Sequence, residues 1–291
     1  MKFNSKVTFN SKVTLNSRLI FNSLFTAAAA LFFSQVLHES IHLFASWAVG
    51  AQVNAFNLFA VETVLFKNGT DTWKNLVIEG SASIVNVIIG FLSLLAFCAI
   101  KRMPALLRQF FLQLTGYSLL MGFGYFMFDA LFYSPGAVGD WKSILTMLGG
   151  SLYLRIPLIL IGGGGVLFIF FWMAKNILVF CENRESKQER FRTAFPVLLM
   201  PYVVYGILYL VLSVWHPIGF PEGLLVIFFQ FVFGFSGFLW AFFLSVYWLK
   251  PNLKDKRYFG LPEKLSLWWM AFAVGVLVFE IAYLLPTVQI N

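Results

Sequence analysis

Seven long apolar segments dominate this chain of 291 residues and restrict the folds that it can adopt. Each segment is long enough to cross about 30 Å of hydrocarbon as a helix that rises about 1.5 Å per residue. Because the apolar runs are continuous and do not alternate with polar residues, they favour helices over the strands of a β-barrel. The sequence therefore predicts an all-α, polytopic transmembrane bundle of about seven spans, at roughly residues 24–49, 78–100, 110–132, 156–180, 195–215, 224–249 and 267–285.

Composition and loop charges support this interpretation. Hydrophobic residues make up 59% of the chain and charged residues 12%, more apolar surface than one soluble core can bury. Cytoplasmic loops of membrane proteins are enriched in Lys and Arg, so the net charge of +8 indicates basic loops and not a nucleic-acid partner. We expect a multi-pass protein of the cell membrane with a cytoplasmic N-terminus, because the basic residues gather in alternate loops, at residues 2–18, 101–108, 184–192 and 250–264.

A metal-binding pattern lies inside the first predicted span. His38 and His42 are four residues apart and share one helix face, with their Cβ atoms about 5–6 Å apart. Two imidazoles at this spacing can hold one Zn²⁺, and the intervening Glu39 can act as general base on the attacking water. Ionisable residues are costly in lipid and usually have a function there, so this pattern predicts a catalytic zinc site.

Two histidines leave zinc one protein ligand short, because catalytic zinc sites have three protein ligands. Asp140 and Asp129 are the candidates, since both fall near the outer end of the third predicted span, at the depth of the histidines. His216, the one other histidine, is expected in an interfacial loop. Spacing alone leaves the choice between the two aspartates open.

Together these elements resemble the site-2 protease family of intramembrane zinc metalloproteases. Beyond the histidine pattern, Ala82 to Asn86 is similar to that family's Gly-Pro-x-x-Asn element, with Gly-Pro replaced. The segment Pro135 to Asp140 is similar to its Pro-rich Leu-Asp-Gly element, with Gly139 and Trp141 at the flanking positions. The resemblance covers roughly residues 30–145. It implies that Asp140 is the third zinc ligand and that Asn86 lies near the substrate or the developing oxyanion, with Asp129 as the alternative ligand.

Two other features have competing interpretations. The sequence Gly234-Phe235-Ser236-Gly237 matches the nucleophile element of rhomboid serine proteases, but no histidine follows residue 216 to act as base. A helix-packing face of small residues is therefore expected there. Glu280, in the last predicted span, is expected to line a polar cavity or pair with another span, outside the catalytic site.

The predicted organisation has three parts. Residues 1–18 form a basic cytoplasmic lead with a short repeat, residues 19–150 a metalloprotease-like membrane core, and residues 151–291 additional membrane spans. The predicted activity is zinc-dependent endopeptidase cleavage of a membrane protein or peptide, in or beside the bilayer. The alternative is a non-enzymatic metal-binding membrane protein or a divalent-metal transporter that uses the same ligands.

Overall fold

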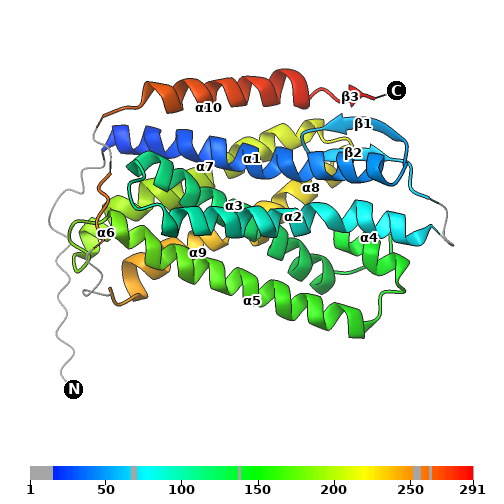
Figure 1. The fold of residues 1–291 in the computed structure, drawn as a ribbon, viewed down its shortest axis with the longest axis horizontal. Helices are drawn as coiled ribbons and strands as arrows, with labels where there is room; N and C mark the ends of the chain where they lie inside the picture. The colour runs from blue at the N-terminus through cyan, green and yellow to red at the C-terminus, as the bar shows by residue number, and fades with distance from the viewer. Residues whose placement is uncertain (1–15, 67–70, 137–138, 252–256, 262–263, 291) are drawn as a thin grey trace.

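A computed structural model describes residues 16–66, 71–136, 139–251, 257–261 and 264–290. Most of the basic lead and its short repeat lie outside these residues. Within them the chain forms a bundle of long helices that run along one common direction (Figure 1). The longest are α1 (Ser17–Ala48), α2 (Thr72–Ala99), α3 (Ala105–Leu131) and α5 (Leu152–Asn176). The predicted all-α polytopic bundle is confirmed.

The remaining helices are shorter and are joined end to end by 3₁₀ and π turns. The turn η1 (Ile177–Phe180) continues α5, and α10 (Leu267–Phe279) continues into η6 (Glu280–Leu284). Two further spans are composite, and α4 (Asp140–Met147) is a separate short helix. The composite spans consist of α6 (Lys187–Ala194), η2 (Phe195–Leu199), α7 (Met200–Leu212) and η3 (Ser213–Trp215), and of α8 (Glu222–Phe229), η4 (Gln230–Gly234), α9 (Gly237–Phe243) and η5 (Leu244–Trp248).

Six of these helical stretches in the described residues are long and apolar enough to cross a membrane. The third predicted span corresponds to α3, which has 27 residues and is thus about 40 Å long, but is less apolar than the others. Polar residues such as Gln109 and Gln113 face inward and are fully buried. Because α3 packs against α1, α2, α4, α5, α9 and η4, protein and not lipid surrounds most of it, which explains its lower hydropathy.

A small sheet, which the continuous apolar runs did not predict, covers one end of the bundle. The hairpin of β1 (Val53–Asn57) and β2 (Ala60–Thr63) follows α1, and β3 (Val288–Gln289) pairs antiparallel with β1, giving the order β2-β1-β3. The sheet is confined to the loop after α1 and to the last described residues, so the all-α class stands. The apolar runs indicate only where the spans lie. They carry no information about β1, whose partner strand β3 lies more than 200 residues further along the chain.

Two buried arginines bind helix ends at one end of the bundle. Figure 1 places the start of α1 and α6 at one end, and the sheet, α4 and the C-terminal strand at the other. At the α6 end, Arg108 donates to the carbonyls of Phe97 and Ile100 at the end of α2, and Arg190 to that of Leu249 after η5. Both arginines stabilise helix C-termini, where unpaired carbonyls carry partial negative charge.

Exposed tryptophans mark both ends as well. Trp47 and Trp73 lie at the sheet end, and Trp248 and Trp268 at the α6 end, each with about half or more of its surface exposed. Tryptophan is enriched where hydrocarbon meets the headgroups. The bundle between these two belts is the part suited to the bilayer.

Candidate metal centre

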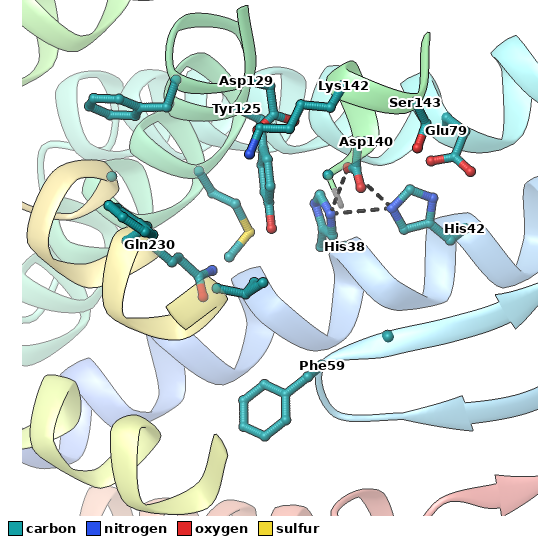
Figure 2. Close-up of a pocket in the computed structure, with 18 of the residues that line it drawn as sticks. His38, His42, Phe59, Glu79, Tyr125, Asp129, Asp140, Lys142, Ser143 and Gln230 are labelled. Carbon is teal, nitrogen blue, oxygen red and sulfur yellow. Dashed lines mark hydrogen bonds and ion pairs between the residues drawn. The ribbon is translucent and has the colours of Figure 1, made fainter. Parts of the chain in front are cut away.

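Three side chains converge near the sheet end of the bundle (Figure 2). His38 and His42 lie one turn apart on α1, and Asp140 is the first residue of α4. The distances are 3.1 Å from His38 Nε2 to Asp140 Oδ2, 3.3 Å from His42 Nε2 to the same oxygen, and 3.3 Å between the two Nε2 atoms. Within the described residues, this is the one group of three such side chains close enough together to hold a metal ion.

The size of this triangle fits a tetrahedral ion. Bonds of about 2.0–2.1 Å at tetrahedral angles place neighbouring ligand atoms about 3.3 Å apart. All three sides match that value within 0.2 Å. The arrangement also leaves a fourth position open, because three protein atoms occupy one face of the tetrahedron. The donor set is therefore suited to a bound metal ion.

Contacts behind the histidines orient both rings. His42 Nδ1 lies 2.8 Å from the carbonyl oxygen of Ile78, which accepts a hydrogen bond from Nδ1–H and turns Nε2 towards the triangle. His38 Nδ1 lies 3.1 Å from the amide of Asn86, whose Oδ1 is buried without a hydrogen-bond partner. With this amide turned by half a rotation, Oδ1 accepts a hydrogen bond from Nδ1–H of His38, the tautomer that leaves Nε2 as the atom facing the triangle. Asn86 is therefore placed to orient the ring of His38.

Asp129 holds the start of α4 and is not part of the triangle. Its Oδ2 accepts a hydrogen bond of 3.0 Å from the backbone N–H of Trp141, and its Oδ1 lies 3.9 Å from Lys142 Nζ. Between the two aspartates, Gly139 has a φ of 144°, where a side chain is strained. A Cβ on Gly139 would lie 2.8 Å from Asp129 Oδ2, so the absence of a side chain lets the two segments approach.

The electrostatics of Asp140 favour its ionised form. Burial alone raises the pKa of a carboxyl. The charge of His42 and hydrogen bonds from both histidines outweigh burial and lower the pKa of Asp140 below its ordinary value. Asp140 therefore carries negative charge beside two imidazoles, as a metal ligand must.

A cavity of about 760 Å³ adjoins the triangle, and Glu39 lies in its wall together with the three ligands. Gln35, one turn earlier on α1, donates a hydrogen bond of 3.1 Å from Nε2 to Glu39 Oε1 and one of 3.2 Å to the carbonyl of Leu58. Gln230 Nε2 donates to Gln35 Oε1 at 3.2 Å. Glu39 is thus linked through Gln35 to both the hairpin turn and η4.

Several residues in this wall were not predicted as site residues. Glu79 lies within the second predicted span and is hydrogen-bonded to Ser143. It lines the cavity with Lys142 and Tyr125. An ionisable residue in an apolar segment was the signal that could have identified Glu79. The other cavity-lining residues follow no motif, because they come from helices that meet only in the fold.

His216 follows η3 in a loop, as expected, but it is buried in the cavity wall instead of facing the interface. It is 5% exposed, and its ring stacks on Phe59 with the ring planes 9° apart. Its Nδ1 accepts a hydrogen bond of 3.2 Å from the backbone N–H of Ile218. Burial lowers the pKa of His216 to about 4, so the ring is neutral at physiological pH.

Two sequence features remain, Glu280 and the glycines at positions 234 and 237. Glu280 pairs with another span, as expected, because Tyr209 donates a hydrogen bond of 2.9 Å to its Oε1. Gly237 packs closely on Leu120, in agreement with a helix-packing face. Gly234 faces α3 as well, since a Cβ on Gly124 would lie 3.6 Å from Gly234 Cα, and Gly234 also lines the cavity.

No protein-family model, curated protein or solved structure matches this chain. The fold and the site therefore define its class by themselves. It is a multi-pass helical membrane protein with a His-His-Asp group that is suited to a metal ion.

Proposed function

We propose that this protein is a zinc-dependent endopeptidase of the cell membrane that hydrolyses peptide bonds in membrane-associated protein or peptide substrates. His38, His42 and Asp140 hold the zinc ion, and Glu39 is the general base. The observation that supports this most directly is the position of Glu39, which lines the same cavity as the three ligands. Glu39 directly follows His38 and precedes His42 by three residues, so all three side chains come from two consecutive turns of α1.

Zinc held by His38, His42 and Asp140 would supply a positive charge that brings the pKa of a coordinated water to about 7 and polarises a carbonyl. Glu39 accepts the proton of the attacking water and transfers it to the leaving amine. Gln35 binds Oε1 of Glu39, which holds the carboxylate in one orientation and leaves Oε2 for this proton. Burial of His38 and His42 lowers the local dielectric and strengthens these interactions.

The hairpin supports a peptide as the substrate. β2 is an edge strand of the sheet, and Ala60, Val61 and Thr63 of this strand line the cavity. An extended peptide can add to such an edge through main-chain hydrogen bonds, which requires no particular sequence. A substrate helix that unwinds beside β2 thereby presents its carbonyls to the ligand triangle.

The depth of the triangle suits a substrate within or beside the bilayer. His42 precedes the exposed Trp47 by five residues and His38 precedes it by nine, which is about 8 and 14 Å along a helix. If Trp47 marks the headgroup level, the ligands lie in the outer part of the hydrocarbon. From the loop charges we infer that the α6 end, where α1 starts, faces the cytoplasm.

The alternative function is that of a divalent-metal transporter or another metal-binding membrane protein. It is favoured by Glu79 and Asp129, which line the cavity beside the ligands and add negative charge that attracts cations. An endopeptidase needs Glu39 for proton transfer but not for holding the ion. The two functions therefore differ in what Glu39 does.

The decisive experiment compares Glu39→Gln with His38→Ala in purified protein. We expect about one zinc per chain in the wild type and in Glu39→Gln, and none in His38→Ala. Cleavage of single-span peptides in proteoliposomes should be lost in both variants. Cleavage that survives in Glu39→Gln would overturn Glu39 as the general base. Wild-type protein that holds zinc without cleaving any peptide would overturn the endopeptidase proposal, and zinc flux into the liposomes without cleavage would favour the transporter.

A further inference from the structure

Tyr125 lies directly beside the ligand triangle. Its ring stacks on that of His38, with centroids 5.1 Å apart and planes 16° apart. It lines the cavity with His38, His42 and Glu39. Figure 2 shows its hydroxyl level with the imidazole of His38, on the side of the cavity that faces Gln230. Within the described part of the chain, this hydroxyl makes no hydrogen bond.

We propose that the hydroxyl of Tyr125 donates a hydrogen bond to the oxyanion that develops on the scissile carbonyl. This inference rests on the proposed endopeptidase function. Peptide hydrolysis places a negative charge on the carbonyl oxygen as the tetrahedral intermediate forms. A donor that faces the reacting group without a partner in the free protein is already in place and gives up no other bond.

The family resemblance implies a different donor, Asn86, but its position does not suit that role. Its side chain is fully buried, its amide contacts His38 Nδ1, and it does not line the cavity. Asn86 lies behind the ligand ring, whereas Tyr125 lies on the face of that ring and lines the cavity. The asparagine therefore orients the ligand, and the oxyanion requires another group.

The other side-chain donors in the cavity wall are engaged or distant. The Gln230 amide donates to Gln35 Oε1, and Gln35 Nε2 donates to Glu39 and to a backbone carbonyl. Lys142 is paired with Asp129. His216 stacks on Phe59, and Figure 2 shows the Phe59 ring well apart from the two ligand histidines. Tyr125 is the donor that is both unengaged and adjacent to the ligands.

The chemistry balances with Tyr125 as a donor only. The water oxygen attacks the carbonyl carbon, its proton passes to Glu39, and the C=O electron pair moves to the carbonyl oxygen. Tyr125 keeps its proton and stabilises this oxygen through the hydrogen bond. When the pair returns, the C–N bond breaks and the proton on Glu39 passes to the leaving nitrogen. No oxidant or further reactant is required.

The test is Tyr125→Phe, which removes the hydroxyl and retains the ring stacked on His38. The matched control is Tyr117→Phe, two turns earlier on α3. Tyr117 is fully buried against Phe235 and Phe238, and its hydroxyl also has no partner, but it does not line the cavity. Removing an unpaired buried hydroxyl costs little, so this control should resemble the wild type.

We expect Tyr125→Phe to retain one zinc per chain and a KM within about twofold of the wild type, while kcat falls roughly 10²–10³-fold. A second readout measures binding alone. A peptidyl phosphinate, which carries charged tetrahedral oxygens, should bind roughly 10–100-fold more weakly to the variant. A mercaptoacyl peptide of the same side chains, which binds zinc through sulfur, should bind equally to both proteins.

Two results would overturn the inference without touching the proposed function. One is an unchanged kcat in Tyr125→Phe, and the other is an equal loss of both inhibitors or of zinc, which would mean that the ring only supports His38. A different pattern tests the function itself: wild-type protein that holds zinc but neither cleaves peptides nor binds the phosphinate overturns both proposals.

Discussion

The substitution Gly139→Ala tests whether the close approach of Gly139 to Asp129 positions Asp140. Gly139 precedes the ligand Asp140, has a φ of 144°, and would place a Cβ 2.8 Å from one oxygen of Asp129 and 2.9 Å from the other. Contacts this short do not occur, so either the loop or Asp129 must move. The unfavourable φ costs about 1–3 kcal/mol. Breaking the charge-assisted bond from Trp141 N–H to Asp129 costs about 1.5–3 kcal/mol.

Relief of this strain moves Asp140 away from the histidines, and zinc binding must then restore the strained position. A cost of about 3 kcal/mol corresponds to roughly 10²-fold weaker zinc binding, since 1.4 kcal/mol is a factor of ten. The measurement is the zinc dissociation constant of the purified protein in competition with a chelator. Thermal unfolding without zinc, run in parallel, separates loss of the site from loss of the fold.

The matched control is Gly136→Ala in the same loop. Gly136 also has a positive φ, of 78°, but a Cβ there would meet nothing within 4 Å. It therefore carries the backbone strain without the contact with Asp129. A double variant with Asp129→Ala removes the obstructing oxygens, so the two losses should be less than additive. If Gly139→Ala binds zinc as tightly as Gly136→Ala does, the close approach does not position Asp140.

Three further predictions concern other parts of the molecule. Asp140→Ala should abolish zinc binding, whereas Asp129→Ala should weaken it by about 10–100-fold, which metal analysis and chelator competition will distinguish. The pKa of His216 is lowered from 6.5 to about 4, so below pH 6.5 the unfolded chain binds its proton more tightly. Stability from this group should fall by up to about 3 kcal/mol between pH 6.5 and 4 and be constant above, and His216→Phe should remove that component from unfolding curves. For the orientation, cysteines at Phe220 and at Glu185 should react with impermeant maleimide from opposite sides, with Phe220 outside; the reverse would assign the sheet end to the cytoplasm.

The part of the site that the sequence predicted best is the part that is local. His38, Glu39 and His42 lie within five residues, so helical geometry alone sets their spacing. Asp140 is almost a hundred residues further on, and only the family resemblance selected it over Asp129. The choice depends on how α3 ends and on how the chain folds back through Gly139. Neither feature produces a periodic pattern in the sequence. Asp140 is a corner of the triangle, and Asp129 supports the start of α4 through the backbone N–H of Trp141.

What the sequence could not predict is the wall of the cavity. Gln230 reaches Gln35 from almost two hundred residues away, through a π turn that continuous hydrophobicity conceals. Glu79 is an ionisable residue in a predicted span, but this signal is weak because it is the second residue of that span, where charges are ordinary. The sheet was missed for a related reason, because β1 and β3 are paired across nearly the whole chain.

That pairing has a consequence for how the protein matures. The hairpin that faces the ligand triangle is held from outside by the last described residues: Leu58 N–H donates to the carbonyl of Leu284, the Asn57 amide to that of Leu285, and Ile290 N–H to that of Asn54. During synthesis the three ligands emerge long before these residues do. On the proposed function, a newly made chain would hold zinc while one wall of its cavity is still unfixed, and it would become competent for cleavage only once α10 is inserted. Truncation after residue 266 should then leave zinc bound and reduce cleavage, and a truncated protein as active as the full chain would show that the hairpin needs no such support.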